Sequence, residues 1–139
     1  MLLLLALLGT VSTAALPDPT LTPGQLTGAT KAEICATRWG TDARRVTPAM
    51  KRQIFGWYQV PQADRKKYEV DHLIPRSAGG ADTVKNLWPQ PWPSARQKDR
   101  LETLLHKRVC VVGDLSLAEA REAFADWPSA YRRYVGVGR

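Results

Sequence analysis

The chain of 139 residues has only two cysteines, Cys35 and Cys110, and no C-x-x-C pair. Two cysteines cannot supply the ligands of a zinc knuckle, so that class of metal site is excluded. After its first residues the sequence also lacks an apolar stretch long enough to cross a membrane, and it contains no internal repeat. The main part of the chain is therefore predicted to be neither a membrane-spanning nor a repeat protein.

Positive charge is missing at the start of the chain, where an uncharged leucine run, Leu2–Leu8, follows Met1 directly. Small residues then continue to Ala15. An apolar run that ends in small residues is typical of a signal peptide, although the usual Lys or Arg is absent. We therefore predict a signal peptide over residues 1–15. The protein is expected to be exported, either periplasmic or extracellular, with no membrane association after cleavage. The alternative is a buried N-terminal helix.

Residues 16–30 are rich in Pro, Thr and Gly, which predicts an extended lead-in ahead of a domain over residues 31–139. The composition is that of a folded domain, with 44% hydrophobic and 24% charged residues. In an oxidising compartment, Cys35 and Cys110 are expected to form a disulfide bond. The alternative is two buried thiols, which requires the signal-peptide prediction to be wrong.

The formal net charge is +7, and the excess is concentrated in the first two thirds of the chain. Residues 31–70 contain nine Lys or Arg against four acidic residues, residues 71–109 contain seven against four, and residues 110–139 contain four of each. This distribution suits a protein that binds a phosphate backbone, although a merely soluble basic surface would look the same.

Local patterns predict helices, and a strand pair joined by a glycine turn. Residues 47–58 have a capping Thr47, a proline at the first position and a helical apolar stripe, and a shorter helix is expected over residues 30–37. Alternating residues predict a strand over 68–74, with Gly79 and Gly80 in the turn that follows. A second short strand is expected over residues 84–88.

Prolines at positions 89, 91 and 93 predict a stiff loop after this strand. A helix is then expected to open at Ser94, with Gln97 completing a capping box, and to bury a leucine stripe. A last helix is predicted from Ser116, capped together with Glu119, and Pro128 is expected to break or kink it.

The segment from Val70 to His106 contains DHLIPRSAGG, NLWPQP and the helical KDRLE in this order. With these motifs the segment resembles the HNH endonuclease superfamily. Together with the early Ile34-Cys35 and the late Val109-Cys110, these words are similar to a group of small exported bacterial HNH-type proteins. The resemblance implies an α+β fold, in which a ββα-metal hairpin and helix are joined by flanking helices and one disulfide. It also implies an endonuclease that hydrolyses nucleic-acid phosphodiester bonds with low sequence specificity.

The chemistry assigns a role to each motif residue. A neutral imidazole is a natural proton acceptor near pH 7, so His72 is the candidate general base. The resemblance implies one divalent metal ion beside His72, with Asp71 as a ligand, and Mg, Mn, Ni and Zn are not distinguished. Because neighbouring strand residues point to opposite faces, these two roles require a local twist or bulge. The resemblance assigns Asn86 to holding the glycine loop and the His72 ring.

The third HNH position departs from the family, because the helix offers no standard His or Asn in its first turn. Ser94, Gln97 and Lys98 are expected on or beside its inner face, whereas Asp99 is expected to project away. Ser94 or Gln97 would coordinate weakly, and Lys98 would instead supply charge to the phosphate. Glu102 and His106, one turn apart, would reach a metal only if the helix were rotated.

The expected partner is nucleic acid, DNA before RNA, with no small-molecule cofactor. Phosphate contacts are assigned to basic residues around the motif. These residues are Arg76, Lys85, Arg96, Lys98 and Arg100. Two alternatives stay open. One is an HNH scaffold that binds nucleic acid but has lost catalysis, and the other is an exported, disulfide-linked domain that binds a protein.

Overall fold

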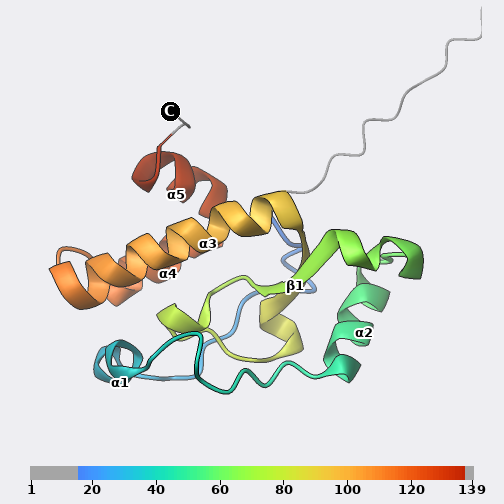
Figure 1. Cartoon of the computed structure of the whole chain (residues 1–139), viewed down its shortest axis with the longest axis horizontal. Coiled ribbons are helices and arrows are strands. Elements are labelled where there is room, and N and C mark those ends of the chain that lie inside the picture. Colours follow the sequence, from blue (N-terminus) through green and yellow to red (C-terminus); the bar gives the residue numbers. More distant parts are fainter. Residues whose placement is uncertain (1–15, 137–139) are drawn as a thin grey trace, which may run out of the picture.

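The computed structural model describes residues 16–136, which form a mixed α+β fold with one two-stranded antiparallel sheet (Figure 1). The elements follow in the order α1 (Lys31–Ala36), α2 (Pro48–Trp57), the 3₁₀ helix η1 (Gln62–Lys67), β1 (Tyr68–His72), the 3₁₀ turns η2 (Arg76–Ala78) and η3 (Val84–Asn86), β2 (Leu87–Pro91), α3 (Trp92–Lys107), the π-helical turn η4 (Arg108–Val112), α4 (Leu117–Ala125) and α5 (Trp127–Tyr134). No helix in this part of the chain has the length and apolar character needed to traverse a bilayer. The predicted signal peptide lies outside the described residues.

Helix ends follow the capping signals in the sequence. The hydroxyl of Thr30 caps α1 and that of Thr47 caps α2, with Pro48 at the first helical position as predicted. Ser116 and Glu119 form the expected capping box at α4. The last helical region is divided into α4 and α5 beside Pro128, which confirms the predicted break.

Strand β2 lies three residues later than predicted, because two prolines that looked like loop residues are part of it. β1 and β2 pair from Tyr68 with Pro91 to His72 with Leu87. Beyond the last pair, Leu73 N–H donates to Asn86 O at 2.8 Å. Hydrogen-bonded and non-hydrogen-bonded pairs alternate along an antiparallel ladder, so Pro89 and Pro91 lie in non-hydrogen-bonded pairs. A proline there loses no ladder bond, since its nitrogen faces the free edge of the sheet.

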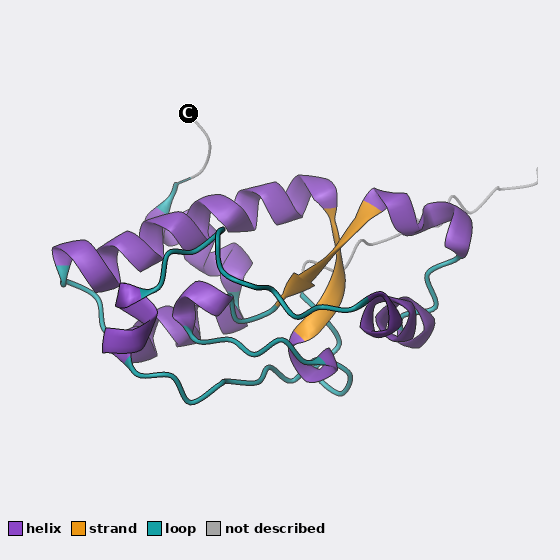
Figure 2. Ribbon diagram, turned by 60° about the horizontal axis from the view of Figure 1, so that its bottom comes forward, coloured by secondary structure: helices purple, strands orange, loops and turns teal. Residues whose placement is uncertain are grey.

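Helix α3 begins directly at the end of β2, so the predicted loop over residues 89–93 does not exist (Figure 2). The helix starts at Trp92 rather than Ser94, and Pro93 lies in its first turn, where a missing N–H is tolerated. The expected capping box of Ser94 and Gln97 is wrong. The Ser94 hydroxyl instead donates to Pro91 O at 2.9 Å.

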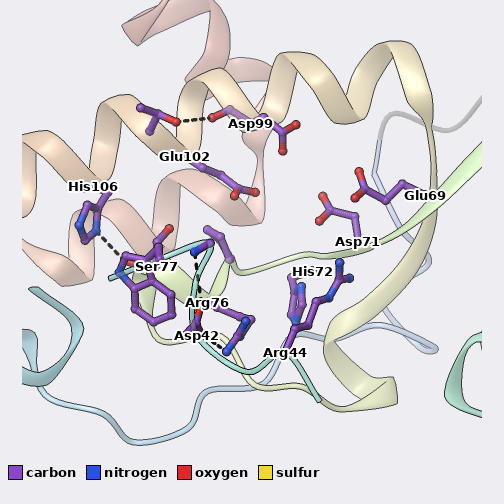
Figure 3. Close-up of a pocket in the computed structure, with 14 residues that line it drawn as sticks. Asp42, Arg44, Glu69, Asp71, His72, Arg76, Ser77, Asp99, Glu102 and His106 are labelled. Atoms are coloured by element: carbon purple, nitrogen blue, oxygen red, sulfur yellow. Dashed lines mark hydrogen bonds and ion pairs between the residues drawn. The ribbon is translucent and has the colours of Figure 1, made fainter. Parts of the chain in front are cut away.

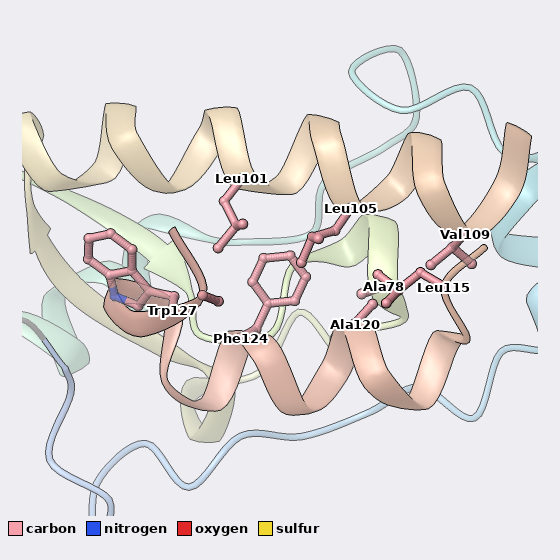
Figure 4. Packing of buried hydrophobic residues seen from close by; sticks show 9 residues of the cluster. Ala78, Leu101, Leu105, Val109, Leu115, Ala120, Phe124 and Trp127 are labelled. Atoms are coloured by element: carbon pink, nitrogen blue, oxygen red, sulfur yellow. The ribbon is translucent and has the colours of Figure 1, made fainter. Parts of the chain in front are cut away.

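The main core lies between α3 and the last two helices (Figure 4). Leu101 and Leu105 of α3 are completely buried, and they face Phe124 of α4 and Trp127 of α5. A second, smaller core packs α2 against the sheet. These two cores fix α3 on one side of the hairpin and α2 on the other, as Figure 1 shows.

The disulfide prediction is confirmed. Cys35 in α1 and Cys110 in η4 are bonded across a sequence separation of 75 residues. The bond joins the beginning of the fold to the end of its central helix, and it is compatible with an oxidising compartment.

Residues 16–30 contain no helix, and they are packed against the body of the fold. The buried Thr22 donates its hydroxyl proton to Leu87 O at 2.9 Å. Further along, Gly24 N–H donates to Lys85 O and Thr27 N–H donates to Gly79 O, both at 2.9 Å. Hydrogen bonds between remote main-chain groups make this segment part of the folded unit, which does not begin at Lys31.

Candidate functional site

A cavity of about 500 Å³ opens between β1, α3 and the loop that precedes α2 (Figure 3). It brings together two residues of the DH motif and several charged groups from remote segments. Its lining is Trp39, Gly40, Asp42, Arg44, Glu69, Asp71, His72, Pro75, Arg76, Ser77, Asp99, Glu102, Thr103 and His106. Both Asp71 and His72 line the same cavity, although they are adjacent on β1.

His72 is only 5% exposed, and its Nε2 lies 2.7 Å from Asp82 Oδ1. Burial lowers the pKa of His72, and the hydrogen bond to Asp82 opposes this only in part, so the ring is neutral near pH 7. Burial alone would raise the pKa of Asp82, but hydrogen bonds from the Arg45 main chain and from His72 lower it on balance. The ionised carboxylate can only accept, so Nε2 carries the ring proton and Nδ1 keeps its lone pair.

Asn86 is completely buried and ties together the two ends of the hairpin loop. Its side-chain oxygen accepts from Ile74 N–H at 3.0 Å, and its amide donates to Ile74 O at 2.9 Å and to Ala81 O at 3.0 Å. A Cβ on Gly80 would lie 1.7 Å from Ile74 O, which explains the glycine beside this clamp. Asn86 therefore holds the glycine loop as expected, but it acts on the main chain after His72 and not on the imidazole ring.

Replacing Asn86 by leucine is expected to destabilise the fold by about 3 kcal/mol, since the Ile74 and Ala81 groups would be left buried without partners. Urea unfolding of the variant and the wild type measures the difference. Lys85→Ala is the matched control, because Lys85 is the exposed neighbour on the same turn. An Asn86→Leu protein as stable as the Lys85→Ala control would contradict the clamp.

Lys98 is completely buried under the cavity, and its ammonium forms three hydrogen bonds there. Its Nζ donates to Asp71 Oδ2 at 3.0 Å, to His72 O at 2.6 Å and to Glu102 Oε1 at 2.5 Å. Burial opposes its charge, but Asp71 and Glu102 outweigh this effect and raise the pKa of Lys98. The ammonium uses all three of its donors on protein oxygens.

Acidic side chains form the α3 side of the cavity. In Figure 3, Asp99 and Glu102 extend from α3 toward the strand that carries Asp71 and Glu69. Burial and the charge of Asp71 raise the pKa of Glu69 to about 6. Burial also raises the pKa of Asp99 and of Glu102, with Asp71 adding to both effects. The mutual repulsion of these carboxylates makes this wall attractive to positive charge.

The divalent ion implied by the HNH resemblance does not fit beside Asp71 in this arrangement. The ammonium of Lys98 already lies between Asp71 and Glu102, where it contacts one oxygen of each carboxylate. Among residues 16–136, no three His, Cys, Asp or Glu side chains are grouped to hold a metal ion. The position of Lys98 is therefore what keeps a divalent ion from binding between Asp71 and Glu102.

Several predicted site residues lie elsewhere than expected. Lys98 is buried, so it has no surface to offer a phosphate. Asp99, expected to project away, lines the cavity. Glu102 and His106 also line it, and the His106 ring packs edge-on against Trp39. Of the other predicted helix-side and basic residues only Arg76 lines the cavity, and the ones outside its lining are Ser94, Gln97, Lys85, Arg96 and Arg100.

Two functional candidates, Asp82 and Arg44, were missed because their side-chain partners depend on how the chain folds. Asp82 lies ten residues after its partner His72, within the glycine turn. Arg44 comes from the loop before α2, where its guanidinium donates to Val70 O on β1 at 2.6 Å. The acidic residue in the turn was the one visible signal for Asp82, whereas nothing in the local sequence distinguishes Arg44 from other basic residues.

Comparisons with known proteins identified no relative of this chain. No family model matches the chain, and no similar protein was found among curated proteins or among solved structures.

Proposed function

We propose that the protein is an exported hydrolase of nucleic-acid phosphodiester bonds with low sequence specificity. The observation that carries the proposal is the pairing of His72 with Asp82 at a cavity that also presents Arg44 and Arg76. The order of β1, β2 and α3, with His72 and Asn86 at the two ends of the connecting loop, supports the HNH resemblance. The disulfide bond supports export to the periplasm or the exterior.

In the proposed reaction, Nδ1 of His72 takes a proton from a water molecule, and the resulting hydroxide attacks phosphorus. The bond from phosphorus to the leaving oxygen breaks, and that oxygen takes a proton from solvent. Asp82 stabilises the imidazolium that forms, as a carboxylate beside a catalytic histidine does. The acidic wall on α3 repels the phosphate, so the substrate is expected on the side of Arg44 and Arg76.

Arg44 is the exposed guanidinium of this pair, since Arg76 is engaged with Asp42 and Asp82. Replacing Arg44 by alanine is expected to weaken DNA retention and to lower the slope of log K against log salt by about 1. Filter-binding titrations at several salt concentrations measure this slope. Arg132→Ala, on the exposed face of α5 outside the cavity lining, is the matched control. Equal slopes for the two variants would remove Arg44 from the phosphate site.

A cleavage assay tests the function itself. Purified protein is incubated with plasmid DNA and with RNA, in chelator or with Mg, Mn, Ni or Zn ions. Nicked product and retained nucleic acid are then scored separately. If neither DNA nor RNA is cut under any of these conditions, the proposed activity is overturned.

A second candidate is a scaffold that binds nucleic acid without cutting it. The position of Lys98 favours this alternative, because its buried ammonium lies beside Asp71 and has all three donors on protein oxygens, so it has none left to polarise a phosphate. In the same assay this candidate gives salt-sensitive retention and intact nucleic acid with every ion.

A further inference from the structure

Three oxygen atoms from two segments of the chain, β1 and α3, converge on one buried nitrogen at the floor of the cavity. Asp71 contributes a side-chain oxygen from within β1, His72 contributes its main-chain oxygen at the strand end, and Glu102 contributes a side-chain oxygen from α3. The nitrogen is Nζ of Lys98, which is completely buried.

This donor set has the chemistry of a site for a hard cation. Carboxylate and main-chain carbonyl oxygens are the ligands that divalent cations such as Ca²⁺ and Mn²⁺ take in proteins. Here the distances of 2.5 to 3.0 Å are those of charge-assisted hydrogen bonds from an ammonium group. Asp71 and Glu102 also line the cavity, so a divalent cation in place of the ammonium would find both protein oxygens and access to water.

We infer that the ammonium of Lys98 is a built-in cation, which takes the place of a divalent metal ion between Asp71, His72 O and Glu102. The inference goes beyond the proposed function, since it concerns cation occupancy and holds whether or not the protein cleaves nucleic acid.

Two consequences follow from this substitution of an ammonium for a metal. In the wild type, Asp71 and Glu102 are not available to a divalent cation, so their pairing is insensitive to chelator. Once the ammonium is removed and its space is left open, the same oxygens should accept a divalent cation.

The experiment compares Lys98→Ala with Lys98→Met in chelator and in millimolar Mn²⁺. Both variants leave the carboxylates without their buried partner, and both are expected to melt about 10 °C or more below the wild type in chelator. Alanine leaves room for an ion, whereas methionine fills the space with an uncharged chain of similar length. Mn²⁺ should therefore raise the melting midpoint of Lys98→Ala by about 5 °C or more, and leave Lys98→Met and the wild type unchanged.

Electron paramagnetic resonance counts the bound Mn²⁺ and gives a readout that does not depend on activity. One additional equivalent is expected in Lys98→Ala relative to the wild type, and it should be lost when Glu102→Gln is added to that variant. If Lys98→Ala is unfolded in chelator, its folding on addition of Mn²⁺ supports the inference in the same way as a raised melting midpoint. The inference is overturned if Mn²⁺ neither folds nor stabilises Lys98→Ala, or if it stabilises all three proteins equally. The cleavage assay is separate, so a failed inference leaves the proposed function standing, and the reverse also holds.

Discussion

His72→Ala is expected to lower phosphodiester cleavage by a factor of about 100 or more, since general-base catalysis contributes about that much to a hydrolysis rate. The loss follows from the removal of an imidazole that is neutral near pH 7 and whose Nε2 is held by the ionised Asp82, which leaves Nδ1 to accept the proton. Initial rates of plasmid nicking measure the effect. Circular dichroism and a thermal melt of the variant establish that the fold persists.

The pH dependence of the wild-type rate provides a second check on the same residue. Only the neutral imidazole can accept a proton, so the rate should rise with pH through the pKa of His72. Burial holds that pKa below its usual value of 6.5, and the rate is therefore expected to reach its plateau near neutral pH. A rate that continues to rise above pH 8, or an alanine variant that cuts at the wild-type rate, would remove His72 from the reaction.

Loss of the disulfide bond is expected to destabilise the protein by roughly 4 kcal/mol, because the bond closes a long loop in the unfolded chain. The sequence separation of 75 residues places this bond among those with a large entropic effect. The double variant Cys35→Ser/Cys110→Ser avoids a free thiol and isolates the contribution of the cross-link. Urea unfolding of the variant and of the oxidised protein measures the difference.

Reductant provides the control for this comparison. It should shift the unfolding midpoint of the wild type toward that of the double serine variant, and it should leave the variant itself unchanged. If the oxidised and reduced proteins unfold at the same urea concentration, the bond contributes no net stability. Such a result would mean that the non-covalent packing of the fold holds equally well without the covalent link between α1 and η4.

Local chemistry allowed much of the secondary structure to be predicted. Thr47, followed by a proline and an apolar stripe, specifies α2 through interactions within one or two helical turns. The second strand was misplaced because Pro89 normally signals a loop. Its tolerance depends on which edge of a two-stranded sheet its nitrogen faces, and this is a property of the pairing register and not of the local sequence.

The candidate site was only partly predictable for a similar reason. The spacing within the motif placed Asp71, His72 and Asn86, but it did not indicate the partners of their side chains. Arg44 reaches β1 through tertiary packing. Lys98 was expected near the inner face of α3 with its charge available to a phosphate, because the sequence of α3 does not reveal that Asp71 and Glu102 would enclose its ammonium. Such partners emerge only when separate segments are brought together.

The two prolines of β2 affect how the protein behaves at high concentration. A small sheet has two open sides, and unpaired main-chain groups on either side can recruit a strand from another copy. Pro89 and Pro91 provide no N–H on one side, and the guanidinium of Arg44 caps the Val70 carbonyl on the other. Growth of the sheet from one molecule to the next is thereby obstructed in both directions, which protects the folded chain against fibril-like assembly.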